Sequence, residues 1–438
     1  MTSETSPAAD ASASAGAHTR VGDAEVEAAL RRVTASLPGS EDRPAQRRMA
    51  AAVAGSIREQ RHLIIQAGTG TGKSLGYLVP ALVLGTRVVV ATATKALQDQ
   101  LATRDLPFLA EQLGGPLEFA VLKGRSNYLC RQRAEELEGA GDQLAAGGGL
   151  VEEPAARNPG PFAREIRRLL EWGRQAETGD RAELSWEPSA AAWSQVSVAP
   201  RDCPGAARCP AGHRCFAEAA RDKAAHADVV VVNTHLYATH LAAGGGILPD
   251  HDLLVVDEAH ELEDIASASL GFELTGGRLA ALARLARPVV AEASVIEAVD
   301  GAAGVLGATL VPHRGRRLTL PLDPAVLDAL TLTRERLARL QGALRSSAHA
   351  SGVGPALSPT LSPDGTGQGG GEDSGLTARR ARAQQAAGNL TTDIDALLAL
   401  GDEQVAWVEG PEHAPVLRVA PIDVGASLDR LLWQNDNA

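Results

Sequence analysis

Short apolar runs alternate with helical patterns along the first 122 residues of the chain. Three runs have the β-branched, apolar composition of buried strands, at residues 62–66, 87–93 and 119–122. Helical patterns occupy residues 25–60, with Pro44 near a helix start, and residues 75–84 and 95–109. This alternation predicts an α/β fold, with a parallel sheet covered by helices on both faces.

The pattern changes in the middle of the chain. Between residues 124 and 226, Arg/Glu-rich helical pieces alternate with Gly/Pro-rich loops, and strand patterns return at 229–232 and 253–256. The middle is therefore interpreted as an insertion within the α/β domain. Beyond residue 271 the chain is mostly helical by pattern, and the segments 405–408 and 416–419 are expected to be strands that return to the sheet.

These patterns divide the chain into five predicted parts, and composition refines them. A Ser/Ala-rich start is expected to be disordered, and a Gly/Ser/Pro/Thr-rich stretch is expected to be a flexible surface loop. The parts are a tail at 1–24, an ATP-binding domain at 25–122 and 227–264, an insertion at 123–226, a helical insertion at 265–402 with its loop at 351–375, and a return to the first domain at 403–438.

Charge and hydropathy exclude some classes of protein. The 438 residues carry a net charge of -12, which argues against a surface that coats nucleic acid uniformly but leaves room for a local basic groove. No secretory signal is recognised at the start, and the apolar stretch 78–90 is too short to cross a bilayer. A cytoplasmic protein that does not engage a membrane is expected.

A glycine-rich turn follows the first predicted strand and precedes a predicted helix. Its sequence is Ala67-Gly68-Thr69-Gly70-Thr71-Gly72-Lys73-Ser74. Glycines let backbone N–H groups converge on a phosphate, and the helix directs its positive end at the same anion. Lys73 is expected to reach the β- and γ-phosphates of ATP, and Ser74 to ligate Mg²⁺. Ala67 stands where the strict phosphate-loop pattern has Gly, and the alternative is a glycine-rich turn without a ligand.

Two acids follow the predicted strand at 253–256, in the sequence Asp257-Glu258-Ala259-His260. Ligands of open α/β sheets bind at the carboxyl ends of strands, so Asp257 is expected beside the phosphate loop, holding Mg²⁺ directly or through water. Glu258 is predicted to act as general base on the attacking water. His260 is predicted to link the nucleotide site to moving parts. A solvated acidic turn is the alternative, and the upstream phosphate loop favours the functional interpretation.

The two motifs together resemble those of superfamily 2 helicases. Arg43-Pro44-Ala45-Gln46 lies where these motors place a glutamine that reads adenine, which implies that role for Gln46. The segment 91–101 resembles their third segment, in which Thr92 and Thr94 would donate hydrogen bonds to DNA phosphates. Residues 227–236 resemble the strand and Asn/His turn before the acidic motif, although Thr234 separates the two side chains and leaves the role of His235 open.

The chain has four cysteines, all inside the predicted insertion. Cys130 and Cys203 have 72 residues between them, and Cys203, Cys209 and Cys215 are each separated by five residues, unlike the close pairs of zinc fingers. Four thiolates suffice for one [4Fe–4S] cluster; zinc and unrelated thiols are the alternatives. The DinG/XPD group of helicases is similar in having such a cluster at this place, and residues 123–130 also resemble its approach to the first ligand. His213 is interpreted as a surface residue.

The insertion also has the residue types that contact nucleic acids. Basic residues surround the cysteines, and they are Lys123, Arg125, Arg131, Arg133, Arg208, Arg214, Arg221 and Lys223. These side chains could contact phosphates or form an ordinary solvated surface. Aromatic residues are only 3% of the chain, so Tyr128 and Phe216 are the candidates for base stacking.

The resemblance implies a fold and an activity. It implies a RecA-like ATP-binding domain with a cysteine-bearing insertion and a mainly helical, arch-like insertion. The implied activity is ATP-dependent translocation 5′ to 3′ on single-stranded or forked DNA in repair or replication, with ATP, Mg²⁺ and a [4Fe–4S] cluster as cofactors. The alternatives are a non-catalytic nucleotide- or DNA-binding remnant and a P-loop ATPase that does not act on nucleic acid.

The resemblance is weak at residues 265–402 and faint near Pro421-Ile422-Asp423, which resembles a segment ahead of the group's Ser-Ala-Thr motif. Neither that motif nor a second motor domain with its arginine finger follows in the sequence. We therefore expect this chain alone to bind nucleotide weakly, to hydrolyse it poorly and not to unwind DNA.

Overall fold

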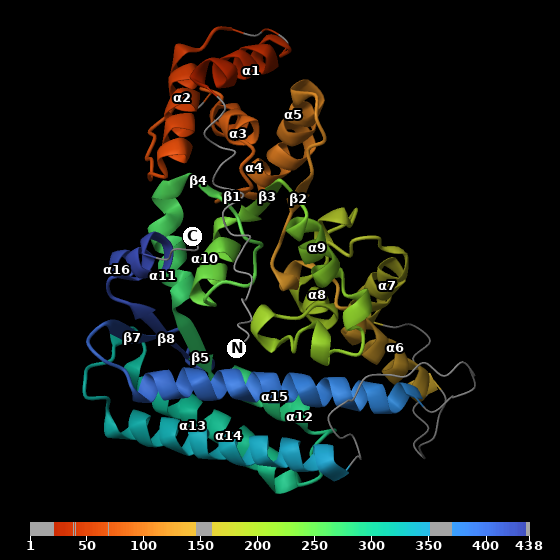
Figure 1. Ribbon diagram of the computed structural model, residues 1–438. Coiled ribbons are helices and arrows are strands. Elements are labelled where there is room, and N and C mark those ends of the chain that lie inside the picture. Colours follow the sequence, from red (N-terminus) through yellow and green to blue (C-terminus); the bar gives the residue numbers. More distant parts are fainter. Residues whose placement is uncertain are drawn as a thin grey trace, which may run out of the picture. The chain divides into compact units, whose positions relative to one another are not determined.

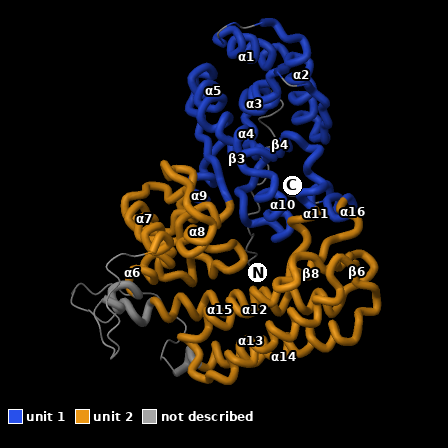
Figure 2. Tube along the Cα trace, turned by 180° about the vertical axis from the view of Figure 1, so that it is seen from behind, with its two compact units in different colours: residues 1–123, 220–266, 425–438 blue, residues 124–219, 267–424 orange. Residues whose placement is uncertain are grey.

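The described part of the chain forms two compact units. The structure is a computed structural model, and it describes residues 22–37, 39, 41–68, 70–145, 160–350 and 370–434. Unit 1 comprises residues 1–123, 220–266 and 425–438, and unit 2 comprises residues 124–219 and 267–424 (Figure 2). Residues 1–21 of the expected tail and 351–369 of the expected loop lie outside the described residues.

Unit 1 is built on a parallel four-stranded sheet of order β2-β3-β1-β4 (Figure 1). The strands are β1 (Val88–Thr92), β2 (Phe119–Val121), β3 (Val229–Asn233) and β4 (Leu253–Asp257). Every residue of β1 is buried, as expected for an apolar strand in the middle of a parallel sheet. The predicted parallel sheet is confirmed.

Unit 1 also contains helices from all three of its chain segments. They are α1 (Asp23–Ala35), α2 (Pro44–Glu59), α3 (Lys73–Val83), α4 (Lys95–Gln100), the π-helix η1 (Leu101–Asp105), α5 (Leu106–Leu113), α10 (Thr234–Ala242), the 3₁₀ turn η7 (Ala259–Glu261), α11 (Leu262–Leu270), α16 (Val424–Leu428) and the π-helix η9 (Asp429–Trp433). Pro44 begins α2, where its missing N–H costs nothing. Apolar side chains of α1, α2, α3 and α5 form one core with β1 and β3.

The expected strand at residues 62–66 is not present. These residues are irregular, and the side chains of Leu63, Ile64 and Ile65 are 43%, 97% and 37% exposed. A strand needs a paired neighbour, and residues 61–68 pair with none of the described strands. Four of the five residues of β4, at the edge of the sheet, are only half-buried. The apolar composition was therefore a correct sign of strand propensity but did not identify a partner.

The cysteine-bearing part of unit 2 consists of short helices and turns, apart from two longer helices. We call residues 124–219 the cysteine module. Its elements are η2 (Arg125–Asn127), α6 (Arg131–Ala145), α7 (Pro161–Gln175), η3 (Arg181–Glu183), α8 (Ala190–Val196), η4 (Pro200–Asp202), η5 (Ala206–Arg208) and η6 (Gly212–Arg214), followed by α9 (Phe216–Ala225). A hydrogen bond from Trp193 Nε1 to the carbonyl oxygen of Ser126 (2.7 Å) ties α8 to the start of the module.

A second, antiparallel sheet lies in unit 2. Its order is β5-β8-β7-β6, from β5 (Phe272–Thr275), β6 (Arg316–Arg317), β7 (Gln404–Glu409) and β8 (Val416–Pro421). The strands expected at 405–408 and 416–419 are therefore real, but the expectation that they rejoin the parallel sheet is wrong. They form a hairpin, and β8 pairs along its other edge with β5, so an antiparallel partner satisfies their backbone groups.

Four helices pack with this second sheet, and Figure 1 shows them lying side by side. They are α12 (Gly276–Ala286), α13 (Ala293–Leu310, continued by the 3₁₀ turn η8, Val311–His313), α14 (Pro324–Ala350) and α15 (Gly370–Leu398). Their apolar faces share one core with β5, β7 and β8. Residues 370–375 of the expected loop are helical instead, because α15 begins at Gly370.

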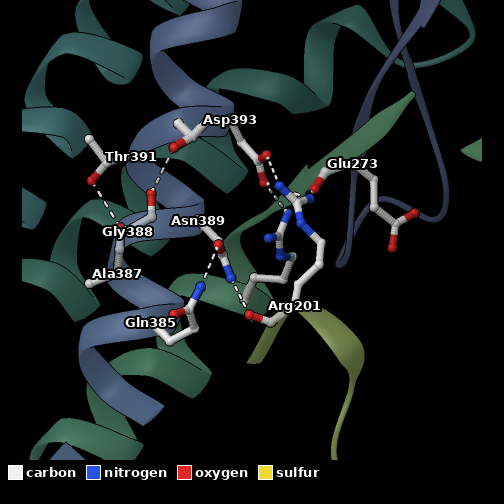
Figure 3. A network of polar contacts seen from close by, with 10 residues as sticks. Arg201, Glu273, Gln385, Ala387, Gly388, Asn389, Thr391 and Asp393 are labelled. Atoms are coloured by element: carbon white, nitrogen blue, oxygen red, sulfur yellow. Dashed lines mark hydrogen bonds and ion pairs between the residues drawn. The ribbon is translucent and has the colours of Figure 1, made fainter. Parts of the chain in front are cut away.

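Helix α15 also holds the cysteine module through a buried carboxylate (Figure 3). Asp393 is 2% exposed and accepts hydrogen bonds from Arg201 (2.5 and 3.2 Å) and from Arg278 of α12 (2.9 Å). One α-helical turn earlier, Asn389 donates to the carbonyl oxygen of Arg201. Because Arg201 lies two residues before Cys203, this network fixes the start of the cysteine loops against α15.

The apolar helix Ala293–His313 is long enough, by length and composition, to cross a membrane. The sequence had suggested no such span. In the structure this helix packs between α12 and α14, and its buried residues belong to the core of unit 2. Packing of this kind is typical of a core helix in a globular unit.

Candidate functional site

Three polar residues end three neighbouring strands of the parallel sheet. In the register of the sheet Thr92 at the end of β1 pairs with Asn233 at the end of β3 and with Asp257 at the end of β4. All three therefore lie in one row at the carboxyl edge. The Asn233 side chain is engaged as the cap of α10, where it accepts a hydrogen bond from the backbone N–H of Leu236 (2.7 Å). Asp257 is the carboxylate in this row of three residues.

The glycine-rich turn has the backbone geometry that its sequence demands. Gly70 and Gly72 both have φ of 77°, a left-handed conformation that side chains with a Cβ disfavour. Gly72 is also the residue directly before α3, so the turn leads straight into the helix N-terminus. The hydroxyl of Thr71 donates to the carbonyl oxygen of Gly68 across the turn (2.9 Å), while Thr69 lies outside the described residues.

Two side chains at the start of α2 support this turn, one from its N-cap residue and one from its first turn. Arg43 donates from Nη1 to the carbonyl oxygen of Gly70 (2.8 Å), and Gln46 donates from Nε2 to that of Gly72 (2.9 Å). A Cβ added to Gly72 would lie 2.2 Å from this Nε2 atom. Gln46, whose predicted partner is adenine, is thus buried against the phosphate loop, and its contact with the loop was not foreseen from the sequence.

Lys73 and the two acids of the second motif converge, although 185 residues separate Lys73 from Glu258. The Nζ atom of Lys73 lies 2.8 Å from Oε1 of Glu258 and 3.8 Å from Oδ1 of Asp257. The hydrogen bond with Glu258 raises the pKa of Lys73, and the same bond lowers the pKa of Glu258. Both groups are therefore charged across the neutral pH range.

The acids differ in their surroundings. Asp257 is 7% exposed, and its Oδ1 accepts a hydrogen bond from the backbone N–H of Glu258 (3.0 Å). Glu258 has φ of 58° and ψ of 45°, a left-handed conformation that is uncommon for a residue with a side chain. This turn directs the Glu258 carboxylate at Lys73 rather than along the strand. The side chain of His260 is 72% exposed, with Nδ1 3.5 Å from Oε2 of Glu258.

Sequence reasoning missed a tyrosine in this site. Tyr77 is 4% exposed, and its hydroxyl lies 3.3 Å from Oδ2 of Asp257. Burial raises the pKa of Tyr77, and Ser74, one turn earlier on α3, lies near enough to the same hydroxyl to act in the opposite direction. The spacing of three residues between Ser74 and Tyr77, which places both on one helix face, was the available signal.

The four cysteines lie in the cysteine module, and each is half-buried. Secondary to burial, the charges of Cys209 and Cys203 raise the pKa of Cys130, and those of Cys203 and Cys215 raise the pKa of Cys209. Burial raises the pKa of Cys130 to about 11 and also raises that of Cys209. Among the described residues, no three His, Cys, Asp or Glu side chains form a group that could hold a metal ion.

Several residues predicted to contact nucleic acid are instead buried or hydrogen-bonded within the protein. Thr92 is fully buried and donates its hydroxyl to the carbonyl oxygen of Thr94, while the Thr94 hydroxyl caps α4. Tyr128 and Phe216 are 4% and 5% exposed, so neither ring is available to stack on a base. The predictions for Thr92, Tyr128 and Phe216 are wrong because the local apolar and capping contacts bury these groups.

Basic residues around the cysteines are largely engaged as well. Arg125 pairs with Glu218, Arg214 pairs with Glu135 (2.8 Å), and Arg133 donates to the carbonyl oxygen of Gln195 (2.7 Å). In addition, Arg131 lies over the ring of Phe216 (4.1 Å to its centroid), and Arg208 donates to Gln385 (2.8 Å). These contacts hold the cysteine module together and, through Arg208, attach it to α15.

Comparisons with known proteins agree with the two motifs. The family described as DEAD/DEAH box helicase matches residues 43–138. The ATP-dependent helicase DinG of Mycobacterium tuberculosis is 45% identical over 259 residues, which are 56% of this chain and 38% of the relative. The ATP-dependent DNA helicase YoaA of Escherichia coli is 39% identical over 254 residues, covering 57% of this chain and 38% of YoaA.

A more distant relative extends the match. The ATP-dependent DNA helicase DinG of Photobacterium profundum is 26% identical over 426 residues, covering 88% of this chain and 59% of that protein. The matches to the M. tuberculosis and E. coli relatives span less than two fifths of their length. The helicase-family match begins at the residues that support the phosphate loop and includes the loop itself. Residues 43–138 therefore match the DEAD/DEAH box helicase family, and the chain is similar to the helicases DinG and YoaA over somewhat more than half of its length.

Proposed function

We propose that this chain is the ATP-binding motor part of an ATP-dependent DNA helicase. The observation that carries the proposal is the convergence of Lys73 with Asp257 and Glu258 at the carboxyl edge of the sheet. This edge is where open α/β sheets bind their ligands. The names of the relatives support the reaction class, since both DinG and YoaA are described as ATP-dependent helicases.

Each residue of the site has a proposed role. The Lys73 ammonium binds the β- and γ-phosphates, together with backbone N–H groups of Gly68, Thr69, Gly70, Thr71 and Gly72. Gln46 reads the adenine edge while its amide holds Gly72. Glu258 orients and deprotonates the attacking water, and His260, exposed beside it, relays the state of the site to moving parts.

A magnesium ion fits the polar groups of this edge. Asp257 presents a nearly buried carboxylate at the strand end, and Ser74 presents a hydroxyl at the start of α3, with Tyr77 close to both. Hard oxygen ligands of this kind suit Mg²⁺, which neutralises charge on the transferred phosphate. We therefore assign Ser74 and Asp257 as the protein ligands of the Mg²⁺ of Mg-ATP.

The cysteine module is proposed to hold a [4Fe–4S] cluster through Cys130, Cys203, Cys209 and Cys215. The donor chemistry supports the proposal, because four thiols in one module can supply one thiolate per iron, and a cluster spreads its ligands more widely than a single ion does. Backbone hydrogen bonds from Arg133 and Ala211 act to lower the pKa of Cys130 and Cys209, against the larger effect of burial, and would favour the thiolate form that a cluster needs.

The turn between the last two ligands is tight. A Cβ on Gly212 would lie 2.2 Å from the carbonyl oxygen of Ala206, so glycine is needed where the loop folds back on itself. When bound, the cluster would supply covalent cross-links between the start of α6 and the loop 203–215, which has only 3₁₀ turns. We propose a structural role for it.

The substrate proposed by resemblance is single-stranded or forked DNA, with translocation 5′ to 3′, in a cytoplasmic repair or replication process. The test of this substrate compares the wild-type chain with the variant Lys73→Ala. Anisotropy of a fluorescent single strand is measured with no nucleotide and with a non-hydrolysable Mg-ATP analogue. We expect the strand to bind, nucleotide to change its affinity, and Lys73→Ala to lose only the nucleotide effect, since coupling between two sites is reciprocal.

Two results would favour other functions. Nucleotide binding without any binding of single strands would indicate a P-loop ATPase that serves another substrate. Strand binding that no nucleotide alters, in a chain that binds no nucleotide, would indicate a non-catalytic remnant. The cluster is tested separately, by the visible absorption spectrum and the iron and zinc content of protein purified without oxygen, and a colourless, zinc-loaded sample would contradict it.

A further inference from the structure

Tyr77 places its hydroxyl between two groups that the proposed function assigns to magnesium. Its ring is buried in the core of unit 1, among apolar side chains of α1, α2 and α3. The hydroxyl emerges from that core 3.3 Å from Oδ2 of Asp257, and the side chain of Ser74 lies near it. The carboxylate and the serine come from different elements, β4 and α3, and Tyr77 connects them.

The two oxygens of Asp257 are held from opposite sides. Oδ1 accepts the backbone N–H of Glu258 (3.0 Å) and faces Lys73 (3.8 Å), while Oδ2 faces Tyr77. A phenol can donate one hydrogen bond and accept others, so it can donate to the carboxylate while accepting from Ser74. This arrangement limits rotation of the carboxylate and aligns the serine with it.

A phenylalanine would fill the same apolar space without the cost of burying a hydroxyl. Burying an alcohol is unfavourable unless it gains hydrogen bonds, and here the partner is Asp257, a proposed metal ligand, with the other proposed ligand, Ser74, close by. The hydroxyl of Tyr77 is therefore best explained by what it does to Asp257 and Ser74.

We propose that Tyr77 is a positioning residue that holds the side chains of Asp257 and Ser74 in the orientation in which both bind the Mg²⁺ of Mg-ATP. The assignment rests on the proposed nucleotide site. Groups that orient metal ligands reduce the ordering that must accompany binding of the ion, and their loss costs roughly 10- to 100-fold in metal affinity.

The test compares Tyr77→Phe with Tyr237→Phe, which removes the same hydroxyl from another buried tyrosine of unit 1. The ring of Tyr237 packs against His240 and His251 rather than against the site. Affinity for a fluorescent ATP analogue is measured in EDTA and across a Mg²⁺ titration. For Tyr77→Phe we expect unchanged affinity in EDTA and a Mg²⁺ midpoint raised roughly 10-fold or more; Tyr237→Phe should match the wild type.

Thermal unfolding of both variants controls for folding. An unchanged Mg²⁺ midpoint in Tyr77→Phe would overturn the role of Tyr77 alone. Equal weakening with and without Mg²⁺ would also overturn it, because that result indicates general damage to the phosphate loop. A wild-type chain that binds no nucleotide under any condition would instead contradict the proposed function, and the assignment of Tyr77 with it.

Discussion

The ammonium of Lys73 donates a 2.8 Å hydrogen bond to Oε1 of Glu258, the residue proposed as general base. A phosphate that binds Lys73 must share or replace this bond. The pair therefore links two events, because nucleotide binding draws Lys73 away from the carboxylate that acts in hydrolysis. The left-handed backbone of Glu258, with φ of 58°, maintains this geometry.

The first prediction concerns the charge of Glu258. Glu258→Gln keeps the size of the side chain but removes the anion that competes for Lys73. We expect Mg-ATP to bind at least as tightly as in the wild type, while single-turnover hydrolysis falls roughly 100-fold or more because the base is lost. Glu261→Gln, an exposed neighbour near His260, is the matched control. Weaker nucleotide binding by Glu258→Gln, or undiminished hydrolysis, would contradict this interpretation.

The second prediction concerns the turn before α3. Gly72→Ala places a Cβ against Gln46 and forces a side chain into a left-handed conformation. Gly85→Ala has a similar φ of 71° but meets nothing within 4 Å. We expect both variants to lose about 1–2 kcal/mol of unfolding free energy from the backbone. Gly72→Ala should lose about 1 kcal/mol more, from the Gln46 hydrogen bond.

Nucleotide affinity separates these two glycines further. Only Gly72→Ala should weaken ATP binding, since Gly85 lies beyond the far end of α3. Urea unfolding and a nucleotide titration on the same samples measure both effects. If Gly85→Ala weakened nucleotide binding as much as Gly72→Ala, the phosphate loop would not be the site.

The third prediction concerns the carboxylate that joins α15 to the cysteine module. Asp393→Asn leaves Arg201 and Arg278 without their shared anion, so we expect a loss of about 1.5–3 kcal/mol of unfolding free energy. Asp395→Asn, two residues further along α15, removes an exposed ion pair with Arg334 and should cost under about 1 kcal/mol. Hydrogen exchange at residues 200–203 should quicken in the first variant only. Equal effects of both variants would contradict the proposed linkage.

The fourth prediction concerns acid. His240 Nδ1 accepts hydrogen bonds from the backbone N–H groups of Ile247 and Leu248 (3.3 and 3.1 Å), so this nitrogen carries no proton. Burial, and then the charge of His251, lower the pKa of His240 from its ordinary 6.5, while Asp250 acts in the opposite direction. Because the folded pKa is depressed, the stabilising contribution is complete above pH 6.5 and is lost as pH falls through the folded pKa.

His240→Gln removes this titration and keeps an oxygen that can accept the backbone hydrogen bonds. Unfolding free energy measured from pH 8 to pH 5 should therefore fall less steeply in His240→Gln than in the wild type. The exposed His226 provides the control, and His226→Gln should keep the wild-type slope. Parallel pH profiles for wild type and His240→Gln would rule out the contribution of His240.

Much of the nucleotide site was predictable from the sequence because parallel strands bring their carboxyl ends together. The expected strand before Lys73 is absent, but the glycine-rich turn still leads into α3, and Asp257 ends β4 as expected, so the predicted proximity of the two residues holds. The contacts of Arg43 and Gln46 with loop carbonyls, and the hydroxyl of Tyr77, were not predictable, because they depend on how α2 and α3 pack against the turn.

The errors in predicting the fold have one physical origin. Residues 62–66 and 405–408 have the composition of strands, but strand formation depends on a neighbour far away in the chain. For 405–408 the sheet is completed through β8 by β5, more than 100 residues earlier, and the described residues provide no neighbour for 62–66. The network around Asp393 was unforeseen for the same reason, since Arg201 and Asp393 are 192 residues apart.

The central claim, that Lys73 and Asp257 belong to one nucleotide site, is tested most directly by Mg-ATP affinity. Isothermal titration compares the wild type with Lys73→Ala and with Lys95→Ala, which removes an exposed lysine at the start of α4. The account predicts that Lys73→Ala loses roughly 10- to 100-fold in affinity, the worth of a charged hydrogen bond, and that Lys95→Ala loses little. Equal affinity of Lys73→Ala and the wild type would contradict it.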